Sequence, residues 1–134
     1  MRYADIPGGS GRLAQALGVP ETISPLARLK ASLTDSTGVY VNAGVNPGAY
    51  YAALAEDIQR NQCKPFEVSA VVTLPGFPHY ALGSTIRAIC VAHRAGYWLV
   101  YEPERDEFMC FWGTSTSNLS APGIYGAPLY CWSS

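Results

Sequence analysis

The chain has 134 residues, of which 49% are hydrophobic and 14% are charged. The charged share lies well below the roughly 25% of an average soluble protein, and such a hydrophobic chain is not intrinsically disordered. Nine Lys and Arg residues against ten Asp and Glu residues leave a net charge of −1, which lacks the positive excess that nucleic-acid phosphates attract. We therefore predict a single domain over residues 1–134 that does not bind nucleic acid.

The N-terminal segment is short of apolar residues and rich in glycine. Residues 1–9 contain no continuous apolar run, so they do not predict a signal peptide, and we expect a flexible arm there. No window of the sequence reaches the roughly 20 apolar residues that a transmembrane helix needs. These features predict a cytoplasmic protein that does not enter a membrane.

The next part of the chain is predicted to be mainly helical. A serine that can cap a helix precedes residues 11–17, and a glycine follows them, so we expect a short helix there. A second helix begins at Ser24-Pro25, a cap residue followed by proline at the first helical position, and runs to about Ser32. Residues 38–43 predict a short strand between turn-rich segments.

The longest predicted helix covers residues 47–62, after the turn residues Asn46-Pro47-Gly48. Tyr50, Leu54 and Ile58 recur every four residues and form one apolar stripe. An amphipathic helix of this length needs an apolar surface to cover. We expect it to pack across one face of a sheet.

From Pro65 onward the apolar residues alternate with polar ones, which is the period of a strand. We predict four strands, at about residues 65–74, 85–92, 97–102 and 107–112. Short turns join the last three, which therefore predict an antiparallel meander. Residues 113–134 are rich in Ser, Gly and Pro but keep three large aromatic side chains, so we expect a packed irregular tail.

The predicted fold class is α+β, with an antiparallel sheet of four to six strands, N-terminal helices, and the helix over residues 47–62 on one face of the sheet. The strand over residues 97–102 is apolar on both of its faces. Either other elements cover both faces, or one face is left for a partner.

No combination of residues predicts catalysis. Cys90 and His93 stand three apart on a predicted strand, so their side chains are expected on opposite faces, and a shared metal ion does not fit unless the strand ends before His93. Cys63 follows the C-terminal end of a helix, where the helix dipole disfavours a thiolate. The four cysteines form no C-x-x-C pair and are expected to stay reduced. We expect no cofactor, no metal and no enzymatic activity.

The densest charge cluster is the turn between the last two predicted strands. Its acidic side chains can steer a basic partner, and flanking aromatic side chains can add affinity. The candidate partner-binding residues are Trp98, Tyr101, Glu102, Glu104, Asp106 and Glu107.

The segment YWLVYEPERDEFMCFWG, residues 97–113, resembles the late hairpin of small bacterial toxin-immunity proteins. The resemblance implies a non-catalytic inhibitor that binds one cognate toxin and blocks its active site or its substrate entry; a homodimer is compatible with that role. One alternative is a purely structural or phage-encoded accessory protein that works by oligomerising. Another is a small-molecule-binding or catalytic cone of the NTF2-like kind. In that case His79 or His93, with Glu67 or Glu102, would line the cavity.

Overall fold

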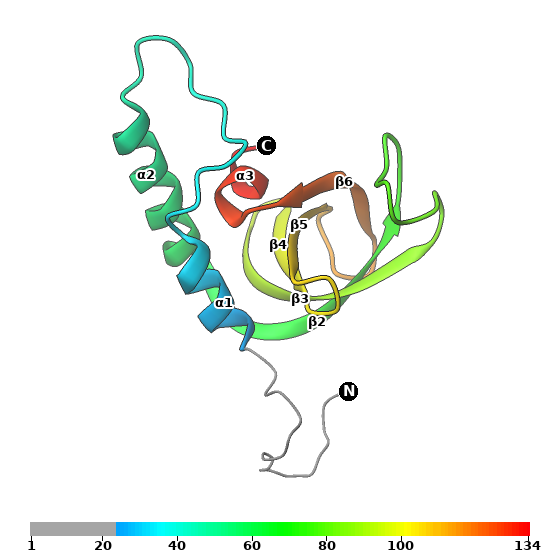
Figure 1. Cartoon of the computed structure of the whole chain (residues 1–134). Coiled ribbons are helices and arrows are strands. Elements are labelled where there is room, and N and C mark those ends of the chain that lie inside the picture. Colours follow the sequence, from blue (N-terminus) through cyan, green and yellow to red (C-terminus); the bar gives the residue numbers. More distant parts are fainter. Residues whose placement is uncertain (1–23) are drawn as a thin grey trace, which may run out of the picture.

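The computed structural model describes residues 24–134 and is shown in Figure 1. In chain order its elements are α1 (Pro25–Ser32), α2 (Pro47–Arg60), β2 (Gln62–Val72), β3 (Thr85–Arg94), β4 (Tyr97–Glu102), β5 (Glu107–Trp112), β6 (Leu119–Gly126) and α3 (Pro128–Ser133). The predicted arm at residues 1–9 and the predicted helix at residues 11–17 lie outside the described residues. No helix within residues 24–134 is long and apolar enough to cross a membrane.

The predicted α+β class and the antiparallel meander are confirmed, and the sheet closes on itself as a barrel. Each consecutive strand pair from β2 to β6 is antiparallel. An odd number of strands in a meander makes the first and the last run in the same direction. The closing pair, β2 with β6, is accordingly parallel, with Ala70 opposite Leu119 and Val72 opposite Ala121.

The start signals of the helices act as predicted. The Ser24 side chain accepts a hydrogen bond from the backbone N–H of Ala27, and Pro25 follows it at the first helical position. At the start of α2, the Asn46 side-chain oxygen accepts from the N–H of Ala49 at 2.9 Å. These bonds satisfy backbone donors that the first turn of a helix leaves free.

Two apolar cores lie on opposite sides of the same strands. The side chains of Trp98 and Val100 on β4 belong to the core inside the barrel. Those of Leu99 and Tyr101 point the other way, into a core that the three helices cover. In Figure 1, α3 lies between α2 and the barrel. Both apolar faces of β4 are therefore covered within the molecule, and neither waits for a partner.

Two local predictions are wrong. Residues 38–43 form no strand, since positions 39–42 are irregular and lie between turns, and the closed barrel offers no free edge with which such a strand could pair. Residues 113–134 are packed as expected, but they form β6 and α3 rather than an irregular tail. Pro and Gly in this segment disfavour a strand, and pairing with both β5 and β2 overrides that local preference.

Candidate functional site

The β4–β5 turn, where the sequence predicts a partner-binding site, is anchored to the rest of the fold. The Glu102 side chain is buried, and its carboxylate accepts hydrogen bonds from the backbone N–H of Glu104 at 3.0 Å and of Arg105 at 2.8 Å. Those two bonds fix the turn from its own base. Glu102 is thus a structural residue of the turn and contributes negative charge from beneath its surface.

Asp106 ties the same turn to helix α1. Its carboxylate accepts two hydrogen bonds from the Arg28 guanidinium, at 2.8 and 3.3 Å, and one from the Tyr101 hydroxyl at 2.6 Å. The hydrogen bond from Arg28 holds the pKa of Asp106 below its usual value. Burial and the bond to Asp106 raise the pKa of Tyr101 to about 12.

The six predicted partner-binding residues therefore differ sharply in access. Tyr101 and Glu102 are buried. Trp98 is half-buried; its indole N–H donates to the Gly113 carbonyl at 2.8 Å and its ring stacks on His93. Glu107 is mostly covered and lies 3.8 Å from the Arg105 guanidinium. Glu104 and Asp106 are exposed, and within residues 24–134 Glu104 forms no ion pair.

Beside this turn lies an open recess of about 410 Å³, which we call the acidic cleft. It lies along β2 and β3 and reaches the first residues of the β4–β5 turn. Its lining residues are Glu67, Tyr80, Thr85, Ile86, Arg87, Ala88, Ile89, Glu102, Pro103 and Glu104. Three of the lining residues are glutamates and one is an arginine, Arg87, whose guanidinium pairs with Glu67 at 3.0 Å. The cleft is therefore net negative.

A second recess, of about 380 Å³, lies between the chain before α2, α2 itself and α3. Its lining residues are Gly38, Tyr40, Asn42, Val45, Tyr50, Tyr130, Ser133 and Ser134. No Asp, Glu, Lys or Arg side chain lines it. We call it the aromatic recess, because three tyrosines form much of its wall.

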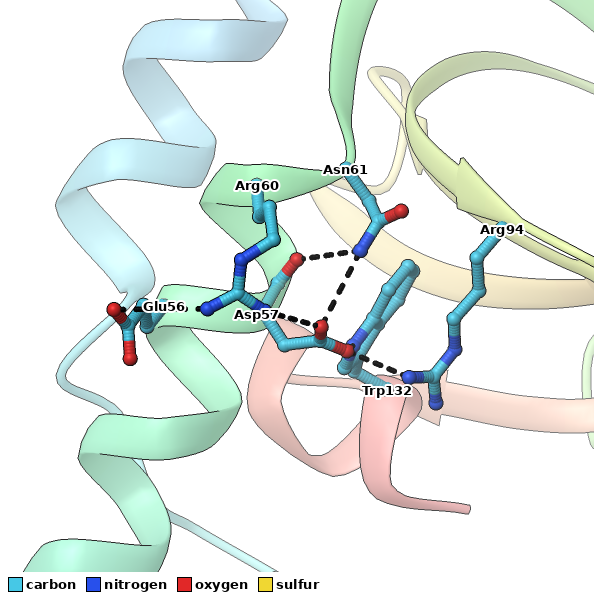
Figure 2. Close-up of polar contacts among 6 residues, drawn as sticks. All are labelled: Glu56, Asp57, Arg60, Asn61, Arg94 and Trp132. Atoms are coloured by element: carbon cyan, nitrogen blue, oxygen red, sulfur yellow. Dashed lines mark hydrogen bonds and ion pairs between the residues drawn. The ribbon is translucent and has the colours of Figure 1, made fainter.

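The densest polar contact in the described residues surrounds Asp57 near the end of α2 (Figure 2). One carboxylate oxygen accepts from Arg94 of β3 at 2.6 Å and from the Trp132 indole of α3 at 2.8 Å. The other accepts from Arg60 at 3.1 Å and from the Asn61 side chain at 3.4 Å. The Arg94 guanidinium also lies over the Trp132 ring, 4.6 Å from its centroid.

This Asp57 cluster joins one helix, one strand and the last helix, and all its partners come from the chain itself. A carboxylate that already accepts four hydrogen bonds has little capacity left for a substrate. We therefore assign the cluster to the fold. Sequence reasoning missed it, since Asp57, Arg94 and Trp132 are far apart in the chain and share no motif.

The prediction that Cys90 and His93 lie on opposite faces of a strand is wrong. Cys90 and His93 lie on the same face of β3, because a bulge between Cys90 and Ala92 inserts one extra residue. His93 packs against two aromatic rings, stacked on Trp98 at 4.7 Å and edge-on to Phe66 at 6.2 Å. Cys90 is fully buried in the core inside the barrel.

The residues required by the NTF2-like alternative do not lie together in the barrel interior. Glu67 and Glu102 line the acidic cleft, whereas His93 lies on the same face of β3 as Cys90 and stacks on Trp98. His79 is exposed on the β2–β3 loop.

Comparison with family models, with curated proteins and with solved structures finds no match for this chain.

Proposed function

We propose that this protein is a non-catalytic binding protein that neutralises a bacterial toxin, with the acidic cleft as the surface that contacts a basic region of the toxin. The resemblance of residues 97–113 to toxin-immunity proteins motivates the role. The observation that carries the proposed surface is the charge of the cleft, whose lining includes Glu67, Glu102 and Glu104 but only one basic residue, Arg87. The proposal includes no cofactor and no enzymatic step.

The cleft suits a lysine or arginine side chain of the partner. Glu102 is held by two backbone N–H groups, and Glu67 projects from a strand of the closed barrel. Carboxylates held in place by the fold lose less conformational entropy on binding than flexible ones do. Exposed Glu104 at the rim adds attraction at longer range, which acts mainly on the association rate.

The test uses the product of the gene that neighbours this protein's own, as a purified and catalytically inactivated protein. Titration of one protein over the other, immobilised on a sensor surface, measures binding between the two. Coexpression with the active form measures protection of cell growth. Binding together with protection supports the proposed function. Absence of binding to this product, or binding without protection, overturns it.

The location of the contact is tested with two matched charge reversals, Glu104→Lys at the cleft and Glu56→Lys on the exposed side of α2. At low salt we expect Glu104→Lys to slow association about fivefold or more and to weaken its salt dependence, since a rim charge mainly steers the encounter. Glu56→Lys should stay within about twofold of the unmodified protein. Equal effects of the two variants would show that the toxin does not bind at the acidic cleft.

A further inference from the structure

We propose that Cys63 and Cys90 are an oxidisable pair that closes to an intramolecular disulfide between strands β2 and β3. Their sulfur atoms lie 4.0 Å apart. Cys63 is the second residue of β2, and Cys90 lies on the paired strand β3. All four cysteines are free thiols in this structure.

The local backbone allows the two sulfurs to approach bonding distance. A disulfide needs sulfurs about 2.05 Å apart and Cα atoms less than about 7 Å apart. Cys90 pairs with Phe66 rather than with Cys63 in the β2–β3 register, so the approach of the two cysteines is given by their sulfurs and not by strand pairing. The β2–β3 register shifts between Gln62 and Phe66, so Cys63 lies where the ladder is irregular. Rotation of its side chain about the Cα–Cβ bond can close the remaining gap.

Access determines the order of events. Cys63 is half-buried, whereas Cys90, Cys110 and Cys131 are fully buried. An oxidant therefore reaches Cys63 first and reaches Cys90 only through it. Burial raises the pKa of the Cys63 thiol and that of the Cys90 thiol still further. Because the thiolate is the attacking species, the reaction should be slow at neutral pH and faster at alkaline pH.

The oxidant that we name is glutathione disulfide. The Cys63 thiolate attacks one of its sulfurs, which breaks that S–S bond, forms a mixed disulfide and releases one glutathione thiolate. The Cys90 thiol loses its proton to solvent, and its thiolate attacks the Cys63 sulfur, releasing the second glutathione. The protein is oxidised by two electrons, and one glutathione disulfide is reduced to two thiols.

The bond would join the start of β2 to the barrel just where the chain leaves α2. Asn61, the residue that ends α2, already accepts a hydrogen bond through its carbonyl from the His93 N–H at 3.1 Å. A disulfide two residues later would make this attachment covalent. The cross-link lowers the conformational entropy of the unfolded chain, so oxidation should raise the unfolding temperature.

The experiment treats the native full-length protein with glutathione disulfide at neutral and alkaline pH. Free thiols are then trapped under denaturing conditions, and proteolytic peptides are mapped by mass spectrometry. We expect two of the four thiols to be lost, a monomer lighter by two hydrogen atoms, and one cross-linked peptide pair containing Cys63 and Cys90. The unfolding temperature should rise on oxidation and return after reduction.

The control variants are Cys63→Ser and Cys90→Ser. Cys63→Ser should leave three unreacted thiols and remove the change in unfolding temperature. If Cys90→Ser folds, it should stop at the glutathione adduct on Cys63; if it does not fold, peptide mapping of the unmodified chain still decides the pairing. Retention of all four thiols, an adduct on Cys63 that never resolves, a disulfide-linked dimer, or a pair involving Cys110 or Cys131 would overturn the proposal.

Discussion

At the scale of single residues, several carboxylates connect elements of the fold through hydrogen bonds and ion pairs. Asp57 gathers donors from α2, β3 and α3, and Asp106 joins the β4–β5 turn to α1. Glu102 fixes the same turn through backbone N–H groups. The acidic side chains that form one charge cluster in the sequence thus mostly form hydrogen bonds or ion pairs within the fold.

Replacement of Asp57 by alanine should destabilise the protein by about 2 to 3 kcal/mol, because the buried Trp132 indole and the Arg94 guanidinium lose their acceptor. Urea unfolding measures the change. Glu56→Ala is the control, since Glu56 is exposed and lies 3.6 Å from Arg60; its effect should stay below about 0.5 kcal/mol. Equal losses from the two variants would show that the Asp57 cluster does not stabilise the fold.

The Arg28–Asp106 pair should make stability depend on acid pH. The folded-state pKa of Asp106 lies below its usual value, so the pair's contribution is fully present above the unfolded pKa of about 3.9 and is lost as the pH falls through the folded value. Asp106→Asn should therefore cost up to about 1 kcal/mol at neutral pH, a small amount because both side chains are partly exposed. The difference in unfolding free energy between Asp106→Asn and the unmodified protein should narrow toward about pH 2.

Urea unfolding at several pH values checks this dependence. Asparagine also tolerates the positive φ of 51° at this position, so the backbone is not an added variable. Glu104→Gln is the matched control, because Glu104 is exposed and forms no ion pair within residues 24–134, and its effect at neutral pH should stay below about 0.5 kcal/mol. A pH-independent effect of Asp106→Asn would contradict the assignment.

The location of the acidic residues could be predicted from the sequence, but their partners could not. Their density at one turn is visible as a run in the chain. Arg28, however, lies 78 residues from Asp106, and only the packing of α1 beside the turn brings them together. The same holds for the acidic cleft, since Glu67 and Glu104 meet through the β2–β3–β4 pairing and not through a motif.

At the scale of elements, prediction succeeded where one segment carries its own period. Strands β4 and β5 occupy the predicted residues 97–102 and 107–112, because both turns and alternation mark their ends. Strand β6 carries Pro122 and Gly123 and has no such local signal. Its place follows from barrel closure, which is a property of all five strands together.

At Gly123, just beyond the pairing with β2, strand β6 approaches the β2–β3 loop closely. A Cβ atom added there would lie 2.2 Å from the Gly76 carbonyl oxygen, and the backbone has a φ of +121°. The close approach lets the Gly76 N–H donate to the Pro122 carbonyl at 2.8 Å. Strand β6 and the β2–β3 loop therefore contact each other through backbone at this point, beside the packing of the Phe77 ring against Tyr125.

Gly123→Ala should destabilise the protein by about 3 kcal/mol or more, since backbone strain and steric overlap add. Gly44→Ala is the control: it has a φ of +86° but nothing within 4 Å of the added Cβ, so it should cost only the conformational part, about 1 to 2 kcal/mol. Urea unfolding measures both. A Gly123→Ala protein as stable as Gly44→Ala would mean that the loop and β6 do not approach this closely.

At the scale of the whole molecule, the two apolar cores share strands. Met109 lies in the core inside the barrel, and Cys110, the next residue of β5, lies in the core beneath the helices. Loss of β5 would open both cores at once. The sequence showed this double-sided apolar pattern in β4, but it could not tell covering helices from a binding partner, because both would leave the same residues apolar.

Shared strands imply that the barrel and the helical layer unfold as one unit. Leu129→Ala, in the core beneath the helices, and Met109→Ala, inside the barrel, both truncate fully buried side chains and should each cost about 2 to 5 kcal/mol. Native-state hydrogen exchange of backbone N–H groups in β4 and in α3 checks whether the loss spreads. Each variant should lower protection in both elements by the same free energy. If Leu129→Ala lowers protection in α3 and leaves β4 unchanged, the helical layer opens separately from the barrel, and the coupling through β3, β4 and β5 is wrong.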